Sequence, residues 1–301
     1  MQIHIEQGRV VIELTPSEFT AFEAMFANLE TEHSLLIEGL DWPPGSAYSY
    51  KFRRKILPMH LCRTIGEACA VEQAGPLDLL SLYPFWKYGF CFSDDSNLRL
   101  EFTEIDPHKK ANLADEFGMG FTAWAMEELF KCEAWCDTSD ALRNWEVEAV
   151  GTRLPDFVCL FADGSFGVFE AKGTTTTIGT AKSQTEDGKI QTLNIVPTSG
   201  HVSVRCACGA HVNRNGISAL ILRDPPEPTP PEPVEGRRGS VTEPIEVHLT
   251  ADAIIRASEA RRYRENLFGD IRTMFVSDSG EFSLVRTPYI AEKRHGWLDI
   301  K

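Results

Sequence analysis

The 301-residue sequence predicts a mixed α/β (α+β) protein built around a central hairpin. Three observations predict this class. Leu154 to Gly173 consists of two apolar runs of strand length joined by a turn, helical segments precede and follow it, and Gly216 to Arg223 is an apolar run typical of a buried strand. The order helix, strand, strand, helix, strand covers roughly residues 111–224.

The N-terminal segment reads as a hairpin followed by a helix. Residues 2–14 alternate around a turn at Gln7-Gly8, and Thr15 to Glu18 forms a capping box with proline at the first helical position. We therefore expect residues 1–105 to form an N-terminal α+β region, in which no catalytic pattern is recognisable.

Within that region, Tyr48 to Lys55 interleaves aromatic and basic residues. Such a pattern suits stacking on bases and pairing with phosphates. The simpler interpretation is an exposed edge strand protected by charge.

The central hairpin turns at Asp163-Gly164, because Asp-Gly between apolar runs is a strong hairpin signal. If only these two residues form the loop, Asp156 lies opposite Ala171 and points away from the charges of the second strand. We predict a three-residue loop, with Gly164 or Ser165 at a positive φ, which pairs Asp156 with Lys172. The open end of the hairpin would then carry three charged side chains on one face: Asp156, Glu170 and Lys172.

Two carboxylates and a lysine on one face suit the hydrolysis of phosphodiesters. A divalent cation activates water and offsets charge on the phosphate, and Mg²⁺ or Mn²⁺ bound by oxygen ligands fits this chemistry. We predict metal binding by Asp156, Glu170 and the backbone carbonyl of Ala171. Lys172 would position the attacking water or stabilise charge.

Pro155-Asp156, a gap of 13 residues and Glu170-Ala171-Lys172 resemble the PD-(D/E)xK nuclease superfamily. The resemblance implies a restriction-endonuclease-like core of a small mixed sheet flanked by helices. It also implies a helix before the hairpin that often donates an acidic residue, and a further helix after it.

Two segments occupy the positions at which this resemblance implies helices. Ala114 to Phe130 comes first and places Glu116 at the acidic position. Thr180 to Asn194 comes second and offers Gln184 as a supporting catalytic residue, although Gly188 interrupts it at a cost of about 1 kcal/mol relative to alanine. Residues 106–224 are therefore the predicted nuclease core.

The function expected from these patterns is that of a metal-dependent endonuclease hydrolysing DNA, in restriction, repair or antiviral defence. The formal net charge of −14 opposes this, because non-specific binding to nucleic acid depends on basic residues. The alternative is a non-catalytic interaction module of the same fold in a larger nucleic-acid-processing complex. DNA is the expected partner, and a protein partner or a homodimer stays open.

A second group of metal-ligand residues lies in HVSVRCACGAH, which contains His201, Cys206, Cys208 and His211. These residues could form a Cys₂His₂ zinc site, but His201 would have to fold back. A hairpin with small buried thiols is the simpler interpretation.

The rest of the chain limits the remaining possibilities. Residues 225–240 contain a proline and acid tract, expected to be a linker or loop, and 241–301 form a predicted C-terminal extension of helix and strands. The eight cysteines form no Cys-x-x-Cys pair, which suggests reduced thiols in the cytoplasm. No uncharged apolar run approaches 18 residues, so no membrane span is expected.

Overall fold

The computed structural model describes residues 2–6, 9–13, 15–40, 49–69, 83–100, 106–143, 154–197, 200–224, 245–247, 250–258 and 281–284. The predicted linker at 225–240 and most of the predicted extension at 241–301 lie outside these ranges. No helix in the described ranges is long and apolar enough to cross a membrane.

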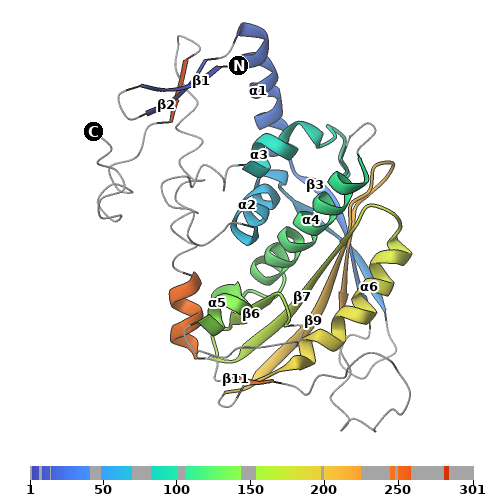
Figure 1. The fold of residues 1–301 in the computed structure, drawn as a ribbon. Helices are drawn as coiled ribbons and strands as arrows, with labels where there is room; N and C mark the ends of the chain where they lie inside the picture. Colours follow the sequence, from blue (N-terminus) through green and yellow to red (C-terminus); the bar gives the residue numbers. More distant parts are fainter. Residues whose placement is uncertain are drawn as a thin grey trace.

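A seven-stranded mixed sheet forms the centre of the molecule, as the mixed α/β prediction required (Figure 1). Its strand order is β4-β3-β10-β9-β7-β6-β5; β7 pairs with β9 and β10 pairs with β3 in parallel, and the other neighbours are antiparallel. The strands are β3 (His33–Leu40), β4 (Tyr50–Ile56), β5 (Ala134–Asp137), β6 (Phe157–Leu160), β7 (Phe166–Thr174), β9 (Val202–His211) and β10 (Ala219–Arg223). Because β3 and β4 belong to this sheet, it crosses the boundary predicted at residue 105.

Helices α4 (Pro107–Glu128) and α6 (Ile178–Gln191) cover opposite faces of the sheet and lie on either side of β7 and β9 in Figure 1. They correspond to the two helices predicted around the hairpin. A Cβ added to Gly173 of β7 would collide with the carbonyl oxygen of Ala114. The backbone of α4 therefore lies directly against β7 at this point.

The largest apolar core lies between the sheet and α4, and α2 (Pro58–Ala68) packs against the same helix. Its bulkiest members are aromatic and less than 2% exposed: Phe117, Phe121, Trp124, Phe157 and Phe169. Burying a side chain of this size contributes about 2–3 kcal/mol. This core holds α4 and the hairpin together.

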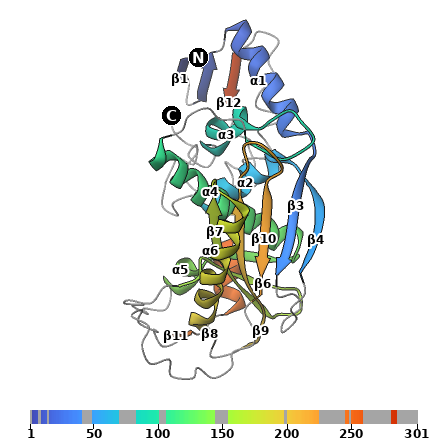
Figure 2. The same cartoon turned by 90° about the vertical axis from the view of Figure 1, so that its right-hand side faces the viewer.

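Shorter elements surround this sheet, and Figure 2 shows a second small sheet beside α1 (Pro16–Leu29). The predicted capping box is confirmed: the Thr15 hydroxyl accepts from the Glu18 N–H, and the Glu18 carboxylate accepts from the Thr15 N–H at 2.8 Å. The predicted N-terminal hairpin is also confirmed, and its turn at Gln7-Gly8 lies outside the described residues. The remaining elements are β1 (Gln2–Glu6), β2 (Arg9–Glu13), α3 (Tyr83–Tyr88), η2 (Gly89–Cys91), α5 (Thr138–Arg143), η3 (Thr192–Asn194), β8 (Ile195–Pro197), β11 (Ile245–Val247), β12 (Glu281–Leu284) and a helix at 251–258.

Strand β4 is one edge of the seven-stranded sheet in the described part of the chain. Its residues from Lys51 to Lys55 are all exposed, and only Ile56 is buried. The charged edge strand predicted from the sequence is therefore present.

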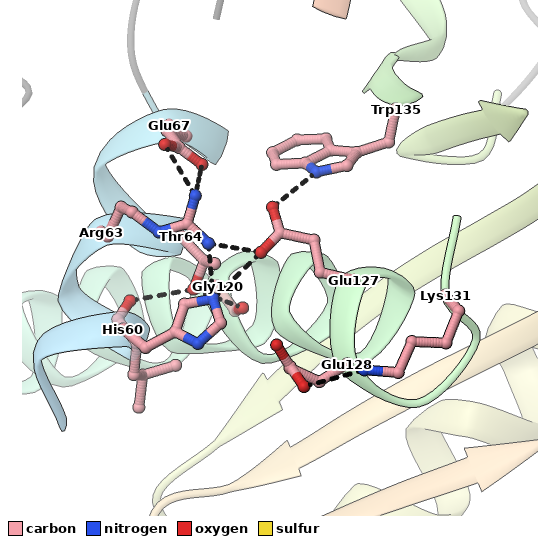
Figure 3. Close-up of polar contacts among 10 residues, drawn as sticks. His60, Arg63, Thr64, Glu67, Gly120, Glu127, Glu128, Lys131 and Trp135 are labelled. Atoms are coloured by element: carbon pink, nitrogen blue, oxygen red, sulfur yellow. Dashed lines mark hydrogen bonds and ion pairs between the residues drawn. The ribbon is translucent and has the colours of Figure 1, made fainter. Parts of the chain in front are cut away.

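A partly buried polar network joins α2 to α4, and Figure 3 shows its contacts. The Glu127 carboxylate accepts from the Trp135 indole at 3.0 Å, lies 3.0 Å from His60 Nε2 and forms an ion pair with Arg63. Arg63 also bonds to Glu67 at 3.2 Å. We call these five residues the Glu127 network.

Candidate active site

The turn of the central hairpin contains three residues, as predicted, but they are Ala162 to Gly164. The Phe161 N–H donates to the Ser165 carbonyl at 2.9 Å, and Gly164 has the predicted positive φ, 80°. Ser165 closes the loop through this backbone bond just before the second strand, and its N–H and hydroxyl both donate to Asp163 Oδ1.

This turn changes the predicted register by two residues. Phe157 pairs with Phe169, so the next position along the hairpin places Asp156 opposite Glu170. The predicted pairing of Asp156 with Lys172 was therefore wrong. Side chains alternate along a strand, so a shift of two keeps Asp156, Glu170 and Lys172 on one face. We call these three residues the carboxylate site.

Asp156 is partly buried at the start of β6. Its Oδ2 accepts a hydrogen bond of 2.7 Å from the Ala171 N–H, just beyond the last β6–β7 pair. Burial raises the pKa of Asp156 despite this bond and the nearby charge of Lys172. The position of this carboxylate is therefore fixed by the backbone of the opposite strand.

Glu170 is the most deeply buried member of the carboxylate site, with 1% of its surface exposed. Burial, and then the charge of Asp156, raise its pKa to about 8, although the Lys172 ammonium lowers it. Glu170 Oε1 accepts from Lys172, whereas Oε2 is buried without a hydrogen-bond partner among the described residues. One lysine thus faces two carboxylates, and one carboxylate oxygen lacks a donor.

Helix α6 covers the carboxylate site with a glycine. A Cβ added to Gly188 would lie 3.1 Å from Glu170 Cγ and 3.6 Å from Lys172 Cε. Gly188 therefore lets the helix lie close to the site, a role that its low helix propensity does not reveal. Gln184 is one turn earlier on α6, and its Oε1 is buried without a partner in the described part of the chain.

Helix α4 contributes two acidic residues, and they point in different directions. Glu116 accepts from Lys87 Nζ at 2.5 Å and from the Tyr88 hydroxyl at 2.6 Å. It lies about 200° around the helix from Gly118, which contacts β7. The charge of Asp115, by contrast, adds to the raised pKa of Asp156, after the effect of burial. Of the two acidic residues of this helix, the exposed Asp115 is thus the one whose charge reaches Asp156, although its contribution is smaller than that of burial.

The four predicted zinc ligands do not converge. Cys206, Cys208 and His211 all lie in β9, a single continuous strand, so the predicted hairpin at this segment was wrong. The cysteine Sγ atoms are 3.8 Å apart and fully buried on one face, whereas His211 projects from the opposite face and His201 is exposed before the strand begins. The alternation of side chains along β9 thus keeps the two cysteines together but separates them from His211.

A divalent cation fits the carboxylate site on chemical grounds. The described residues contain no group of three or more His, Cys, Asp or Glu side chains suited to a metal. Two carboxylates are nonetheless enough for Mg²⁺, which usually keeps several waters. Glu170 Oε2 has no partner among the described residues and would be open to a cation once the carboxyl group has lost its proton. The N–H and carbonyl of a strand residue point to the same side, so we expect the Ala171 carbonyl to face Asp156.

The fold and the site together define a mixed α/β protein with a carboxylate pair and a lysine at the open end of a central hairpin. No family model, curated protein or solved structure matches this chain.

Proposed function

We propose that this protein is a metal-dependent nuclease of the PD-(D/E)xK type, with a restriction-endonuclease-like core, that hydrolyses DNA phosphodiester bonds. The observation that carries the proposal is the excess of acid at the carboxylate site. Glu170 is buried opposite Asp156 with a pKa of about 8 and an unpartnered oxygen, an arrangement that costs stability unless a cation shares it.

In this proposal Asp156 and Glu170 hold Mg²⁺ or Mn²⁺, with the Ala171 carbonyl as a further ligand. A cation bound there would lower the pKa of a water and offset the charge that develops on the phosphate. Glu170 would bind the cation in its ionised form, and Lys172, no longer its main partner, would then be able to donate a hydrogen bond to the attacking water or to a phosphate oxygen.

The remaining side chains support these two carboxylates. Asp115, whose charge reaches Asp156, would orient a water bound to the cation. Gln184 would use its free oxygen to accept from a water at the site. To assist at the site as predicted, Glu116 would have to give up its hydrogen bonds to Lys87 and Tyr88 and turn toward the two carboxylates.

The test is cleavage of supercoiled plasmid, linear duplex and single-stranded DNA with Mg²⁺ or Mn²⁺. We expect Glu170→Gln and Lys172→Ala to lower the rate at least about 100-fold, the scale of a lost charge-stabilising group, while both variants stay folded. Asp156→Asn should have a similar effect.

Glu38→Gln is the matched control. Glu38 is also a buried glutamate on this face of the sheet, 2% exposed, and it pairs with a lysine, Lys182, at 2.6 Å. It belongs to β3, three strands away from β7, so cleavage should persist in this variant. Unchanged cleavage by Lys172→Ala would refute the proposal, and a folded but inert wild type would favour the non-catalytic module.

A further inference from the structure

The edge strand β4 combines positive charge with exposed aromatic surface. Of its seven residues four are basic and none is acidic, in a chain with a net charge of −14. Arg53, Arg54 and Lys55 have no ion-pair partner among the described residues, whereas Lys51 lies 3.5 Å from Glu38. Local positive charge of this kind attracts phosphates even when the whole protein is acidic.

The aromatic residues of β4 form a stacked pair. The rings of Tyr50 and Phe52 are 5.8 Å apart with an interplanar angle of 22°, and Phe52 is 40% exposed. Charge alone is enough to protect an edge strand, so the ring of Phe52 is not needed for that purpose and leaves aromatic surface open to a partner. An aromatic ring beside unpaired basic residues is the arrangement on which unpaired bases stack.

Arg54 shares the face of Tyr50 and Phe52, whereas the other three basic side chains lie on the opposite face of the strand. Glu38 pairs with Lys51 and Leu36 pairs with Arg53, so Lys51, Arg53 and Lys55 share the face covered by α6. Tyr50 and Phe52 lie on the other face. A nucleic-acid strand along this edge can therefore bring its phosphates to one side and its bases to the other.

The basic face of β4 is also the face of the carboxylate site. Lys172 is connected to Lys51 by one cross-strand row through Gly209, Ile221 and Glu38. Four intervals of about 4.8 Å separate the two strands, or roughly 19 Å. A few nucleotides can cover that distance around α6.

We propose that β4 is a docking strand for single-stranded nucleic acid, with Arg53 and Lys55 on phosphates and Phe52 under a base. This deepens the proposed nuclease function, on which its purpose rests. A single strand is the occupant because its bases are free to stack, whereas those of a duplex are paired and stacked inside.

The test is the binding of fluorescein-labelled dT20 and of a 20-base-pair duplex, measured by anisotropy with Ca²⁺ in place of Mg²⁺ across a series of salt concentrations. Arg53→Glu/Lys55→Glu should weaken dT20 binding at least about tenfold and reduce the salt slope by about 1.4, the value for two phosphates of a single strand. Phe52→Leu keeps an apolar side chain and should weaken dT20 binding about tenfold, with little effect on the duplex.

Lys131→Glu/Arg256→Glu is the control with the same change in charge. Lys131 precedes β5, the opposite edge of the sheet, and Arg256 is an exposed residue of the helix at 251–258. Equal weakening by both double variants, an unchanged affinity in Arg53→Glu/Lys55→Glu, or wild type that does not bind dT20 would each overturn the proposal. If dT20 binding shows the expected pattern but no nucleic acid is cut, β4 keeps its role and only the nuclease proposal fails.

Discussion

The carboxylate site and the Glu127 network are both partly buried clusters of charge, but they are balanced differently. Glu127 has three partners. Burial raises its pKa, but the combined lowering by His60, Arg63 and Trp135 is larger, so the net shift of the pKa is downward. Glu170 has Lys172 alone and a second carboxylate beside it, and its pKa rises to about 8. The comparison teaches that burial of charge does not itself indicate function; the cluster whose buried glutamate has an upward-shifted pKa, because its single lysine does not offset burial and the second carboxylate, is the one suited to a cation.

The largest effect on stability should come from the balanced cluster. Glu127→Ala leaves the half-buried Arg63 and His60 without their shared carboxylate, which should lower the free energy of unfolding by about 3 kcal/mol. Urea unfolding measures this. Glu128→Ala is the control, because Glu128 is adjacent and pairs at 3.1 Å with the exposed Lys131, a contact expected to contribute under about 0.5 kcal/mol. Similar values for the two variants would show that the network adds little.

The unbalanced cluster should behave in the opposite way. Because the folded state raises the pKa of Glu170 from 4.5 to about 8, the folded protein holds this proton more tightly than the unfolded chain. Its contribution to stability is therefore lost as pH rises from about 4.5 to about 8. At pH 8.5 without divalent cations, Glu170→Gln should stabilise the protein by about 1–2 kcal/mol, and the gain should shrink below pH 6.

Urea unfolding of Glu170→Gln and wild type at pH 5.5 and 8.5 measures this effect. A loss of stability at pH 8.5, as large as that of Glu127→Ala, would show that Glu170 is balanced after all and would remove the distinction between the clusters.

The smallest expected effect that distinguishes the two clusters is the pH dependence of Mn²⁺ binding. Since Glu170 must lose its proton to bind Mn²⁺, the affinity should increase by up to about tenfold per pH unit between pH 6 and 8 and then level off. Calorimetry in buffers of different ionisation enthalpy should detect nearly one proton released at pH 6.5. Glu127→Gln should leave both quantities unchanged, whereas an affinity for Mn²⁺ that does not depend on pH would contradict the assignment of Glu170 as a ligand.

The hairpin shows how far the sequence alone could predict the site. Asp163-Gly164 indicated the turn and a positive φ at Gly164 or Ser165, because these depend on local backbone chemistry, whereas the three-residue length was predicted because it places the charged residues on one face. The register depended on where the loop closes, and in the folded state it closes between the Phe161 N–H and the Ser165 carbonyl, one residue earlier than predicted. The prediction that Asp156, Glu170 and Lys172 share one face is correct, because a register shift of two residues preserves the alternation of side chains. The residue opposite Asp156 was predicted wrongly, since it is Glu170 and not Lys172.

Tertiary contacts explain what the sequence could not predict. Glu116 and Asp115 are adjacent in an acidic helical segment, and only the folded structure shows that Glu116 bonds to Lys87 and Tyr88 whereas the charge of Asp115 reaches Asp156. Gly188 looked like a defect in α6, because the glutamate against which it packs lies 18 residues earlier on another strand. Cys208 and His211 are close in the sequence, which suggested that they could bind one zinc ion. Because side chains alternate along β9, the two project from opposite faces.

The parallel pairing of β3 with β10 has a consequence for the synthesis of this protein. Leu36 lies opposite Ala219, so the two strands are 183 residues apart along the chain. At about 5–20 residues per second, roughly 10–40 s separate the emergence of β3 from that of its partner. Leu35 and Ile37, both fully buried in the finished sheet, would remain uncovered by β10 for that time, although the hairpin of β6 and β7 closes locally. Completion of the sheet by β10, rather than formation of the site hairpin, would therefore be the slow and aggregation-sensitive step on the ribosome.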